Sequence, residues 1–170
     1  MMAETILVLG GARSGKSAEG ERLIARHPGP SVYIATADAG DAEMAARIAA
    51  HRARRGPLWH TIEAPLDLAG ALDAAETRPA LIDCLTLWLS NLMLGEHDCE
   101  AAGAALMAAL ARRRAPTVLV ANEVGLGIVP DNALARRFRD AAGVLNQRLA
   151  ARMERVIFMV AGYPIEVKRR

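Results

Sequence analysis

Short apolar runs recur along the chain and alternate with longer segments whose apolar residues have helical spacing. Each run has about the length of a buried strand, and most lack alternating polar residues, which is typical of parallel strands covered on both faces. The predicted strands cover residues 6–9, 32–35, 80–82, 117–121 and 156–160. The predicted helices cover residues 16–26, 41–54, 65–75, 85–94, 100–113 and 132–153. This order predicts one three-layer α/β domain over residues 1–170, with a mainly parallel sheet.

The last predicted helix has the clearest amphipathic pattern. Its apolar residues at helical spacing are Leu134, Phe138, Leu145, Leu149 and Met153. Asp131 follows Pro130 and is the predicted N-cap. In sheets of this kind ligands collect at the carboxyl ends of the strands, so we expect the functional residues in the segments that follow each strand.

Composition narrows the class of protein. Of 170 residues, 52% are hydrophobic and 24% are charged, as in a globular domain. The net charge of +2 and the 4% of aromatic residues give no reason to expect nucleic-acid binding or membrane insertion. Cys84 and Cys99 form no C-x-x-C pair, and the N-terminus lacks a basic leader before a long apolar run. We therefore expect a cytoplasmic protein.

The strongest motif lies between the first predicted strand and the first predicted helix. It matches G-x-x-x-x-G-K-[ST] in full and reads Gly10, Gly11, Ala12, Arg13, Ser14, Gly15, Lys16, Ser17. In such a loop backbone N–H groups point at phosphate oxygens, and the helix N-terminus adds partial positive charge. Lys16 is expected to reach the β- and γ-phosphates, and the Ser17 hydroxyl to ligate Mg²⁺. The strand–loop–helix context argues against a chance glycine-rich turn, so the motif predicts a nucleoside triphosphate site, although it leaves the reaction open.

An acidic residue ends the third predicted strand. Asp83 follows an apolar run, as does the carboxylate that holds Mg²⁺ or its water shell in enzymes with this loop. Asp is also a favoured helix cap, and a helix is predicted to begin at Leu85, so a capping role is the alternative. Cys84 fits a packed small residue better than a nucleophile.

A basic helix face follows the second predicted strand. At 3.6 residues per turn one face collects Met44, Arg47, Ile48, His51 and Arg55. If this face looks onto the triphosphate, its arginines neutralise phosphate charge and His51 can attack the α-phosphorus. The alternative is a solvated basic face with an ordinary histidine.

Together these motifs resemble one family, the bifunctional adenosylcobinamide kinase/adenosylcobinamide-phosphate guanylyltransferases. The resemblance spans nearly the whole chain and is carried by residues 10–17, 33–36, 43–51, 59–63, 83–86, 122–130, 135–140 and 143–150. The phosphate loop alone is generic, whereas the loop Asn122-Glu123-Val124-Gly125-Leu126-Gly127-Ile128-Val129-Pro130 and the Asn146-Gln147 pair are distinctive.

The resemblance implies roles for individual residues. It implies that His51 carries GMP as a covalent phosphoramidate. It also implies a nucleotide site that includes Ala35, Thr36, Ala37, Arg52, Ala53, Arg54, Arg55, Glu63 and Asp83. Some relatives have a second histidine just before the one matched here; this chain has Ala50 there, which leaves His51 as the candidate nucleophile.

The resemblance further implies a RecA-like fold of the P-loop NTPase class and two reactions. The enzyme would phosphorylate adenosylcobinamide with ATP or GTP and then transfer GMP from GTP to the product, with Mg²⁺ as cofactor. It also implies a homotrimer. Two other functions compete with this one: a single-function small-molecule kinase and a GTPase switch. The absence of an Asn-Lys-x-Asp guanine element from the chain argues against the GTPase switch.

Three features stay open at this level. The Gly125-Leu126-Gly127 segment either lets the backbone approach a bulky ligand such as the corrinoid or forms a tight turn that needs positive φ. Arg136, Arg137 and Arg139 either contact phosphate or line a helix surface, and residues 168–170 are expected to be a solvated tail.

Overall fold

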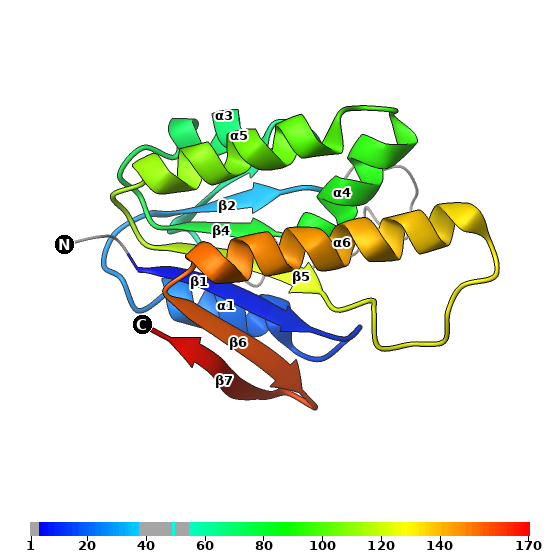
Figure 1. Cartoon of the computed structure of the whole chain (residues 1–170). Coiled ribbons are helices and arrows are strands. Elements are labelled where there is room, and N and C mark those ends of the chain that lie inside the picture. Colours follow the sequence, from blue (N-terminus) through cyan, green and yellow to red (C-terminus); the bar gives the residue numbers. More distant parts are fainter. Residues whose placement is uncertain (1–3, 38–48, 50–54) are drawn as a thin grey trace.

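A seven-stranded sheet forms the centre of the molecule, which a computed structural model describes for residues 4–37, 49 and 55–170 (Figure 1). The strands are β1 (Thr5–Gly10), β2 (Ser31–Ala35), β3 (Trp59–Glu63), β4 (Ala80–Asp83), β5 (Thr117–Asn122), β6 (Arg155–Val160) and β7 (Tyr163–Arg169). Their order across the sheet is β3-β2-β4-β5-β1-β6-β7. The first six strands are parallel, and β7 returns antiparallel to β6. The mainly parallel sheet predicted from the sequence is thus confirmed.

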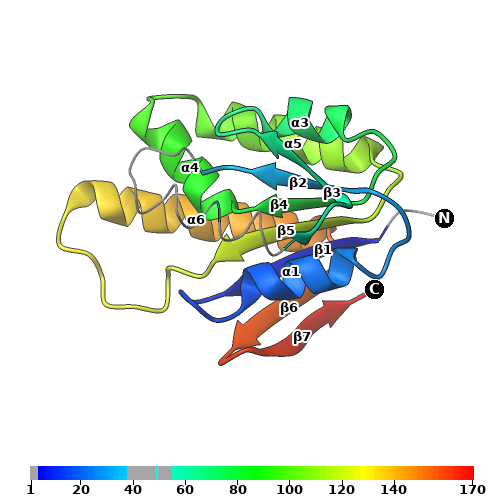
Figure 2. The same ribbon diagram turned by 180° about the vertical axis from the view of Figure 1, so that it is seen from behind.

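Helices cover both faces of this sheet. They are α1 (Lys16–Ile24), α3 (Leu68–Ala74), α4 (Leu85–Leu94), α5 (Cys99–Arg112) and α6 (Ala133–Arg152). α3, α4, α5 and α6 lie on the face turned to the viewer in Figure 1, whereas α1 lies behind it and comes to the front in Figure 2. The result is the predicted three-layer arrangement. None of the helices in the described ranges is long and apolar enough to cross a membrane.

The core is divided between the two faces because successive side chains of a strand point in opposite directions. Leu7, Ile34 and Ile82 belong to the cluster under the four helices. Tyr33 and Leu81 belong to the cluster under α1. Apolar burial on both faces explains why these strands appear in the sequence as unbroken apolar runs.

Two strands were not predicted, and both lie at an edge of the sheet. β3 is only half-buried, and β7 is exposed along most of its length. In β7 the apolar residues Tyr163, Ile165 and Val167 alternate with polar residues or proline. That period-two pattern indicates an edge strand and lacks the continuous apolar run from which the other strands were predicted.

The basic C-terminus is also not the predicted free tail. Lys168 and Arg169 lie in β7, and Lys168 Nζ donates hydrogen bonds to the carbonyls of Ala150, Ala151 and Met153. These carbonyls are at the end of α6, where a helix leaves its last C=O groups without intrahelical partners. Lys168 therefore satisfies the C-terminus of α6.

The start of α6 requires two corrections. Its N-cap is Asn132, whose side chain accepts a hydrogen bond from the N–H of Ala135, and not the predicted Asp131. Leu134, predicted on the apolar face, is 45% exposed because this first turn extends beyond the sheet. Leu149 and Met153, farther along, are buried as predicted.

A buried arginine joins the elements at the amino ends of the central strands. Arg113, at the end of α5, donates hydrogen bonds to the carbonyls of Leu72, Glu76 and Arg78 and to Oγ1 of Thr117. These partners belong to α3 and its C-terminal turn, the approach to β4, and the start of β5. One side chain thus ties three segments together at this edge.

Candidate functional site

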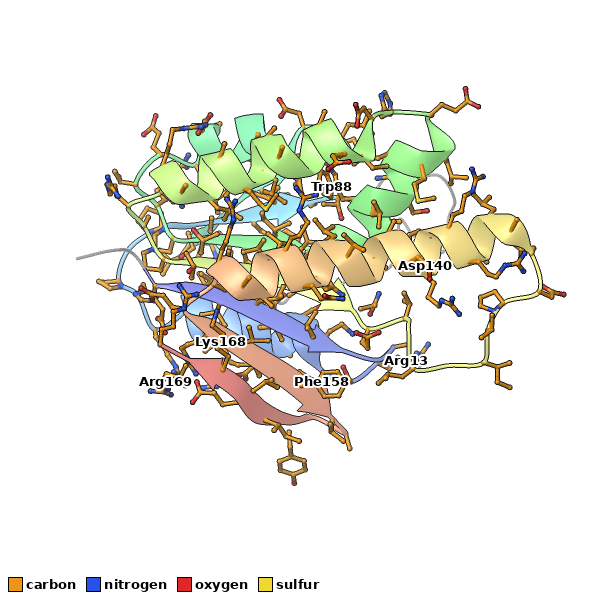
Figure 3. All side chains as sticks on the ribbon, viewed as in Figure 1. Arg13, Trp88, Asp140, Phe158, Lys168 and Arg169 are labelled. Carbon is orange, nitrogen blue, oxygen red and sulfur yellow. The ribbon has the colours of Figure 1, made fainter. Side chains whose placement is uncertain are left out.

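The loop between β1 and α1 lies at the carboxyl edge of the sheet, and its special backbone positions are those expected of a phosphate-binding loop. Gly15 has φ 97° and is the N-cap of α1. At Gly10 a Cβ atom would lie 2.7 Å from Ser14 Oγ and 2.8 Å from the carbonyl oxygen of Met159, so only glycine fits. Arg13 also has positive φ and lies at the tip of the loop (Figure 3).

The loop is held from the neighbouring hairpin. The N–H of Gly162, in the turn between β6 and β7, donates a 3.1 Å hydrogen bond to the carbonyl of Ser14. The N–H of Glu19 bonds to the carbonyl of Gly15 and closes the first turn of α1. The α1 N-terminus therefore opens directly onto the hollow of the loop, where an anion would be stabilised.

Lys16 is buried in this loop and is 7% exposed. Its Nζ donates to the carbonyl of Gly11 at 2.5 Å and lies 3.4 Å from Ser14 Oγ. Burial lowers the pKa of Lys16 below its ordinary value, and the neighbouring Cys84 and Asp83 partly counter this shift. Asp83 ends β4 and Gly10 ends β1, and both strands pair with β5, so the two candidate residues lie at the same carboxyl edge.

Asp83 does not cap the helix that follows it. α4 has Cys84 at its N-cap position, with no side-chain capping hydrogen bond. The Asp83 carboxylate instead accepts a 3.0 Å hydrogen bond from the hydroxyl of Tyr33. Burial raises the pKa of the Cys84 thiol, which fits the expected packing role better than a reactive thiolate.

Strand register brings the predicted nucleotide residues into one row. Ala35 on β2 lies opposite Glu63 on β3 and opposite Asp83 on β4. Thr36 follows Ala35 and is fully buried; its hydroxyl donates to the carbonyl of Cys84 and accepts from the N–H of Cys84, both at 2.8 Å. The side chain of Thr36 therefore joins the ends of β2 and β4.

Arg55 was predicted on the basic face with His51, one residue beyond the predicted helix, and lies in the described part of the chain. Its guanidinium carbon lies 3.3 Å from the centroid of the Tyr33 ring. Nε and Nη1 of Arg55 are buried and have no hydrogen-bond partner among the described residues. Buried donors in proteins are nearly always paired, so these two groups are candidates for binding a ligand. The other residues of that face, Met44, Arg47, Ile48 and His51, lie outside the described residues, as do the predicted nucleotide residues Arg52, Ala53 and Arg54.

The oxygen groups at the edge suit Mg²⁺ that is bound together with a nucleotide. Ser17 supplies a hydroxyl in the first turn of α1, and Asp83 a carboxylate at the end of β4. In the described ranges no group of three or more His, Cys, Asp or Glu side chains could hold a metal ion by itself. Mg²⁺ usually takes one or two protein oxygens and completes its shell with phosphates and water, which this arrangement fits.

The loop after β5 begins at the same edge. The N–H of Glu123 donates a 2.9 Å hydrogen bond to the carbonyl of Gly10. Gly125 and Gly127 are not among the glycines with positive φ, so the interpretation that they form a left-handed turn is wrong. Leu126 and Ile128 are 80% and 96% exposed.

The predicted arginine cluster on α6 is divided between two roles. Arg136 Nη1 donates to the carbonyls of Pro130 and Asp131, which fixes the end of the loop to the helix. Arg139 pairs with Asp140 on the helix surface, and Arg137 is exposed. Arg136 therefore binds backbone carbonyls of the loop, in place of the predicted contact with phosphate.

Two residues that organise this edge had no predicted role. Asn91 on α4 donates from Nδ2 to the carbonyls of Thr36 and Pro65, which joins the segments after β2 and β3. Tyr33 holds Asp83 and lies under Arg55. Tyr33 is a polar aromatic within a buried apolar strand, and this was the signal that could have revealed it.

Comparison with known proteins places these residues in a family. The family model described as cobinamide kinase / cobinamide phosphate guanyltransferase matches residues 6–167. A bifunctional adenosylcobalamin biosynthesis protein CobP from Pseudomonas aeruginosa is 51% identical over 166 residues, covering 95% of this chain and 96% of the relative. Proteins of the same description named CobU, from Salmonella typhimurium and Escherichia coli, are 44% and 42% identical, each covering 96% of this chain and 99% of the relative.

Solved structures with similar folds are much more distant in sequence. A protein of Pyrococcus horikoshii OT3 superposes with a TM-score of 0.56 at 9% identity, covering 99% of this chain and 88% of that protein. An ATPase of a bacterial type III secretion system superposes with a TM-score of 0.54 at 10% identity, covering 94% of this chain and 51% of that protein. These similarities support the P-loop NTPase fold.

Proposed function

The chain belongs to the cobinamide kinase / cobinamide phosphate guanyltransferase family and is a bifunctional enzyme, and from that premise we propose its two reactions. It phosphorylates adenosylcobinamide with ATP or GTP. It then transfers GMP from GTP through a covalent histidine-GMP intermediate to give adenosyl-GDP-cobinamide. The observation that carries this proposal is that the phosphate loop with Lys16 and the carboxylate of Asp83 follow or end β1 and β4, the two strands that flank β5 at the carboxyl edge of the sheet.

In the kinase reaction the hydroxyl oxygen of the aminopropanol group attacks the γ-phosphorus of the triphosphate. A new P–O bond forms, the bond from the γ-phosphorus to the bridging oxygen breaks, and the nucleoside diphosphate leaves while the hydroxyl proton is lost. Lys16 and the N–H groups of residues 10–17 hold the phosphates and stabilise the charge on the leaving diphosphate. Mg²⁺, held by Ser17 and Asp83, supplies further charge neutralisation when bound.

In the guanylyl reaction a nitrogen of His51 attacks the α-phosphorus of GTP, and pyrophosphate leaves. A phosphate oxygen of adenosylcobinamide phosphate then attacks the same phosphorus, the P–N bond breaks, and His51 is regenerated. Arg55 supports this assignment because it follows His51 in sequence, and its buried Nε and Nη1 groups lack partners among the described residues. A phosphate or the guanine base supplies the acceptors that these groups need.

The loop after β5 is the proposed contact for the corrinoid. It starts at the phosphate loop through the hydrogen bond from Glu123 to Gly10, and it presents Leu126 and Ile128 to solvent. An apolar surface of this kind suits a large macrocycle with methyl groups. A homotrimer in the cytoplasm remains the expected setting.

The experiment that tests the two reactions uses GTP labelled at different phosphates. With Mg²⁺ and α-labelled GTP alone, the protein is expected to become labelled through an acid-labile bond. γ-Labelled GTP is expected to label adenosylcobinamide and not the protein. Absence of protein labelling from α-labelled GTP would contradict the covalent intermediate while leaving the kinase reaction intact.

A GTPase switch predicts different behaviour, namely GTP hydrolysis without any corrinoid. We expect turnover to depend on adenosylcobinamide or its phosphate, because the chain's relatives are biosynthetic enzymes. Measurement of GDP and pyrophosphate formation with and without corrinoid separates the two functions, because a switch forms GDP without corrinoid.

A further inference from the structure

Tyr33 makes three separate contacts at the candidate site. It is 6% exposed and lies on β2, on the face of the sheet covered by α1. Its hydroxyl donates a hydrogen bond to Asp83 Oδ2, and its ring lies under the guanidinium of Arg55. Its ring also forms a T-shaped pair with Trp59, with centroids 6.3 Å apart and planes at 73°. It thus contacts residues from β4, from the end of the histidine segment and from β3.

The strand register explains why these contacts are possible. Ala35, two residues after Tyr33, lies opposite Asp83 across the β2–β4 pair. Tyr33 and Asp83 are therefore diagonal neighbours on one face of the sheet, a spacing that a long aromatic side chain can bridge. A phenylalanine would fill nearly the same volume without a polar group. The buried hydroxyl of Tyr33 needs a hydrogen-bond partner, and Asp83 is that partner.

The hydroxyl and the ring act on different groups. The hydroxyl occupies one oxygen of Asp83, and among the described residues no hydrogen bond reaches the other oxygen, Oδ1. The carboxylate is therefore held by one oxygen and can present the other to a ligand. The ring face attracts the Arg55 cation, an interaction that strengthens when water is excluded.

We propose that Tyr33 is a positioning residue with two functions: its hydroxyl orients Asp83 toward the Mg²⁺–phosphate site, and its ring holds Arg55 against the nucleotide. This inference rests on the proposed roles of Asp83 and Arg55. In this proposal Tyr33 acts through its contacts with Asp83 and Arg55. Its hydroxyl affects steps that need the metal, whereas its ring affects steps that need Arg55.

The first test is Tyr33→Phe, which removes the hydroxyl and keeps the ring. Calorimetric titration with an α,β-methylene analogue of GTP, which cannot transfer GMP to the protein, is expected to show the affinity with Mg²⁺ reduced roughly three- to tenfold and the metal-free affinity unchanged. The Mg²⁺ concentration for half-maximal kinase activity should rise by the same factor, while the rate at saturating Mg²⁺ stays near the native rate. A merely structural hydroxyl predicts equal changes with and without the metal.

The matched control is Tyr163→Phe. The chain has two tyrosines, and Tyr163 is 77% exposed on β7. This variant loses the same atom from a side chain that is largely exposed, so none of the GTP affinities should change. Thermal unfolding of both variants separates a folding defect from a change at the site.

The second test is Tyr33→Leu, which removes the ring as well. Guanylyl transfer should fall severalfold more than kinase activity, relative to Tyr33→Phe, and Arg55→Gln should reproduce this selective loss. In an Arg55→Gln background, Tyr33→Leu should cost no more than Tyr33→Phe does. Equal loss of both reactions in Tyr33→Leu would overturn the role of the ring.

Failure of this inference can be told from failure of the proposed function. If Asp83→Asn changes Mg²⁺-GTP binding and Tyr33→Phe does not, the hydroxyl has no positioning role and the function of Asp83 stands. If neither variant changes it, the metal role of Asp83 itself is wrong. In an Asp83→Asn background Tyr33→Phe should have no further effect on the Mg²⁺ dependence, and a full additional effect would also overturn the inference.

Discussion

Two buried cations occupy opposite edges of the same sheet, and they differ in how they use their donors. Arg113 at the amino edge and Lys16 at the carboxyl edge are both 7% exposed. Burial lowers the pKa of both side chains. Arg113 donates to three carbonyls and one hydroxyl on three segments, whereas Lys16 bonds within its own loop.

The difference separates stability from function. A guanidinium whose donors reach several backbone carbonyls fixes the elements that carry them, and its removal leaves those carbonyls without this donor. An ammonium group that bonds only to its own loop fixes little of the fold and can exchange those bonds for phosphate oxygens. Figure 3 shows the same division for two labelled residues: Arg13 lies at the tip of the phosphate loop, and Lys168 lies toward the opposite edge.

The largest expected effect is a selective loss of one of the two reactions at the carboxyl edge. His51→Ala should abolish the covalent GMP adduct and reduce guanylyl transfer at least about 1,000-fold, because the nucleophile is lost. Phosphorylation of adenosylcobinamide should remain measurable, since that step uses the hydroxyl of the substrate. Adduct formation in the native protein should also fall at low pH, because a protonated imidazole has no lone pair to attack phosphorus.

The control for this variant is His97→Ala, which removes an exposed histidine after α4. Both activities should stay native. A folded His51→Ala protein that transfers GMP at the native rate would contradict the histidine intermediate, although not the fold.

The next effect concerns the amino edge. Arg113→Met should lower the free energy of unfolding by roughly 3 kcal/mol, because one buried and two partly buried carbonyl hydrogen bonds lose their donor. For a chain of this size the melting temperature should fall by about 10 °C, while the kinetic constants of the surviving folded enzyme stay native. Calorimetry and assays below the transition measure the two quantities.

The neighbouring Arg112 provides a matched control. It is exposed and pairs with Asp73 at 3.0 Å. Arg112→Met should change the unfolding free energy by less than about 1 kcal/mol, as is usual for a surface ion pair. If the two variants lose equal stability, the hydrogen-bond network of Arg113 does not have the structural role assigned to it.

Lys16→Ala should show the opposite pattern from Arg113→Met. Both reactions need the triphosphate neutralised in the same loop, so each should slow at least ~100-fold, or roughly 2.7 kcal/mol of transition-state stabilisation. The melting temperature should change little, because Lys16 makes no hydrogen bond to another segment among the described residues. Near-native kinase turnover would overturn the phosphate-loop assignment.

The only other lysine in the chain serves as the control. Lys168 bonds three carbonyls at the end of α6, far from the loop. Lys168→Ala should lower the melting temperature without slowing either reaction, the reverse of the Lys16 result.

The sequence predicts those parts of the fold and the site that depend on patterns among neighbouring residues. The phosphate loop and the buried strands were predicted because glycine spacing and apolar runs are local patterns. The half-exposed edge strands β3 and β7 were missed because pairing with a neighbouring strand stabilises them. The Tyr33–Asp83 contact joins residues far apart in sequence, and only the strand register brings them together. The roles of His51 and Arg52 come from family resemblance and await experiment.

Asp83→Asn should have the smallest of these effects, and it tests whether the carboxyl edge is built for a ligand. The amide oxygen can still accept from Tyr33, and Cys84 occupies the N-cap of α4, so stability should be native. The lost charge weakens the Mg²⁺ site, so the Mg²⁺ concentration for half-maximal rate should rise about tenfold in both reactions. A Mg²⁺ titration of each reaction measures this concentration. An unchanged midpoint would indicate that Asp83 has a structural role, like Arg113, and does not bind the metal.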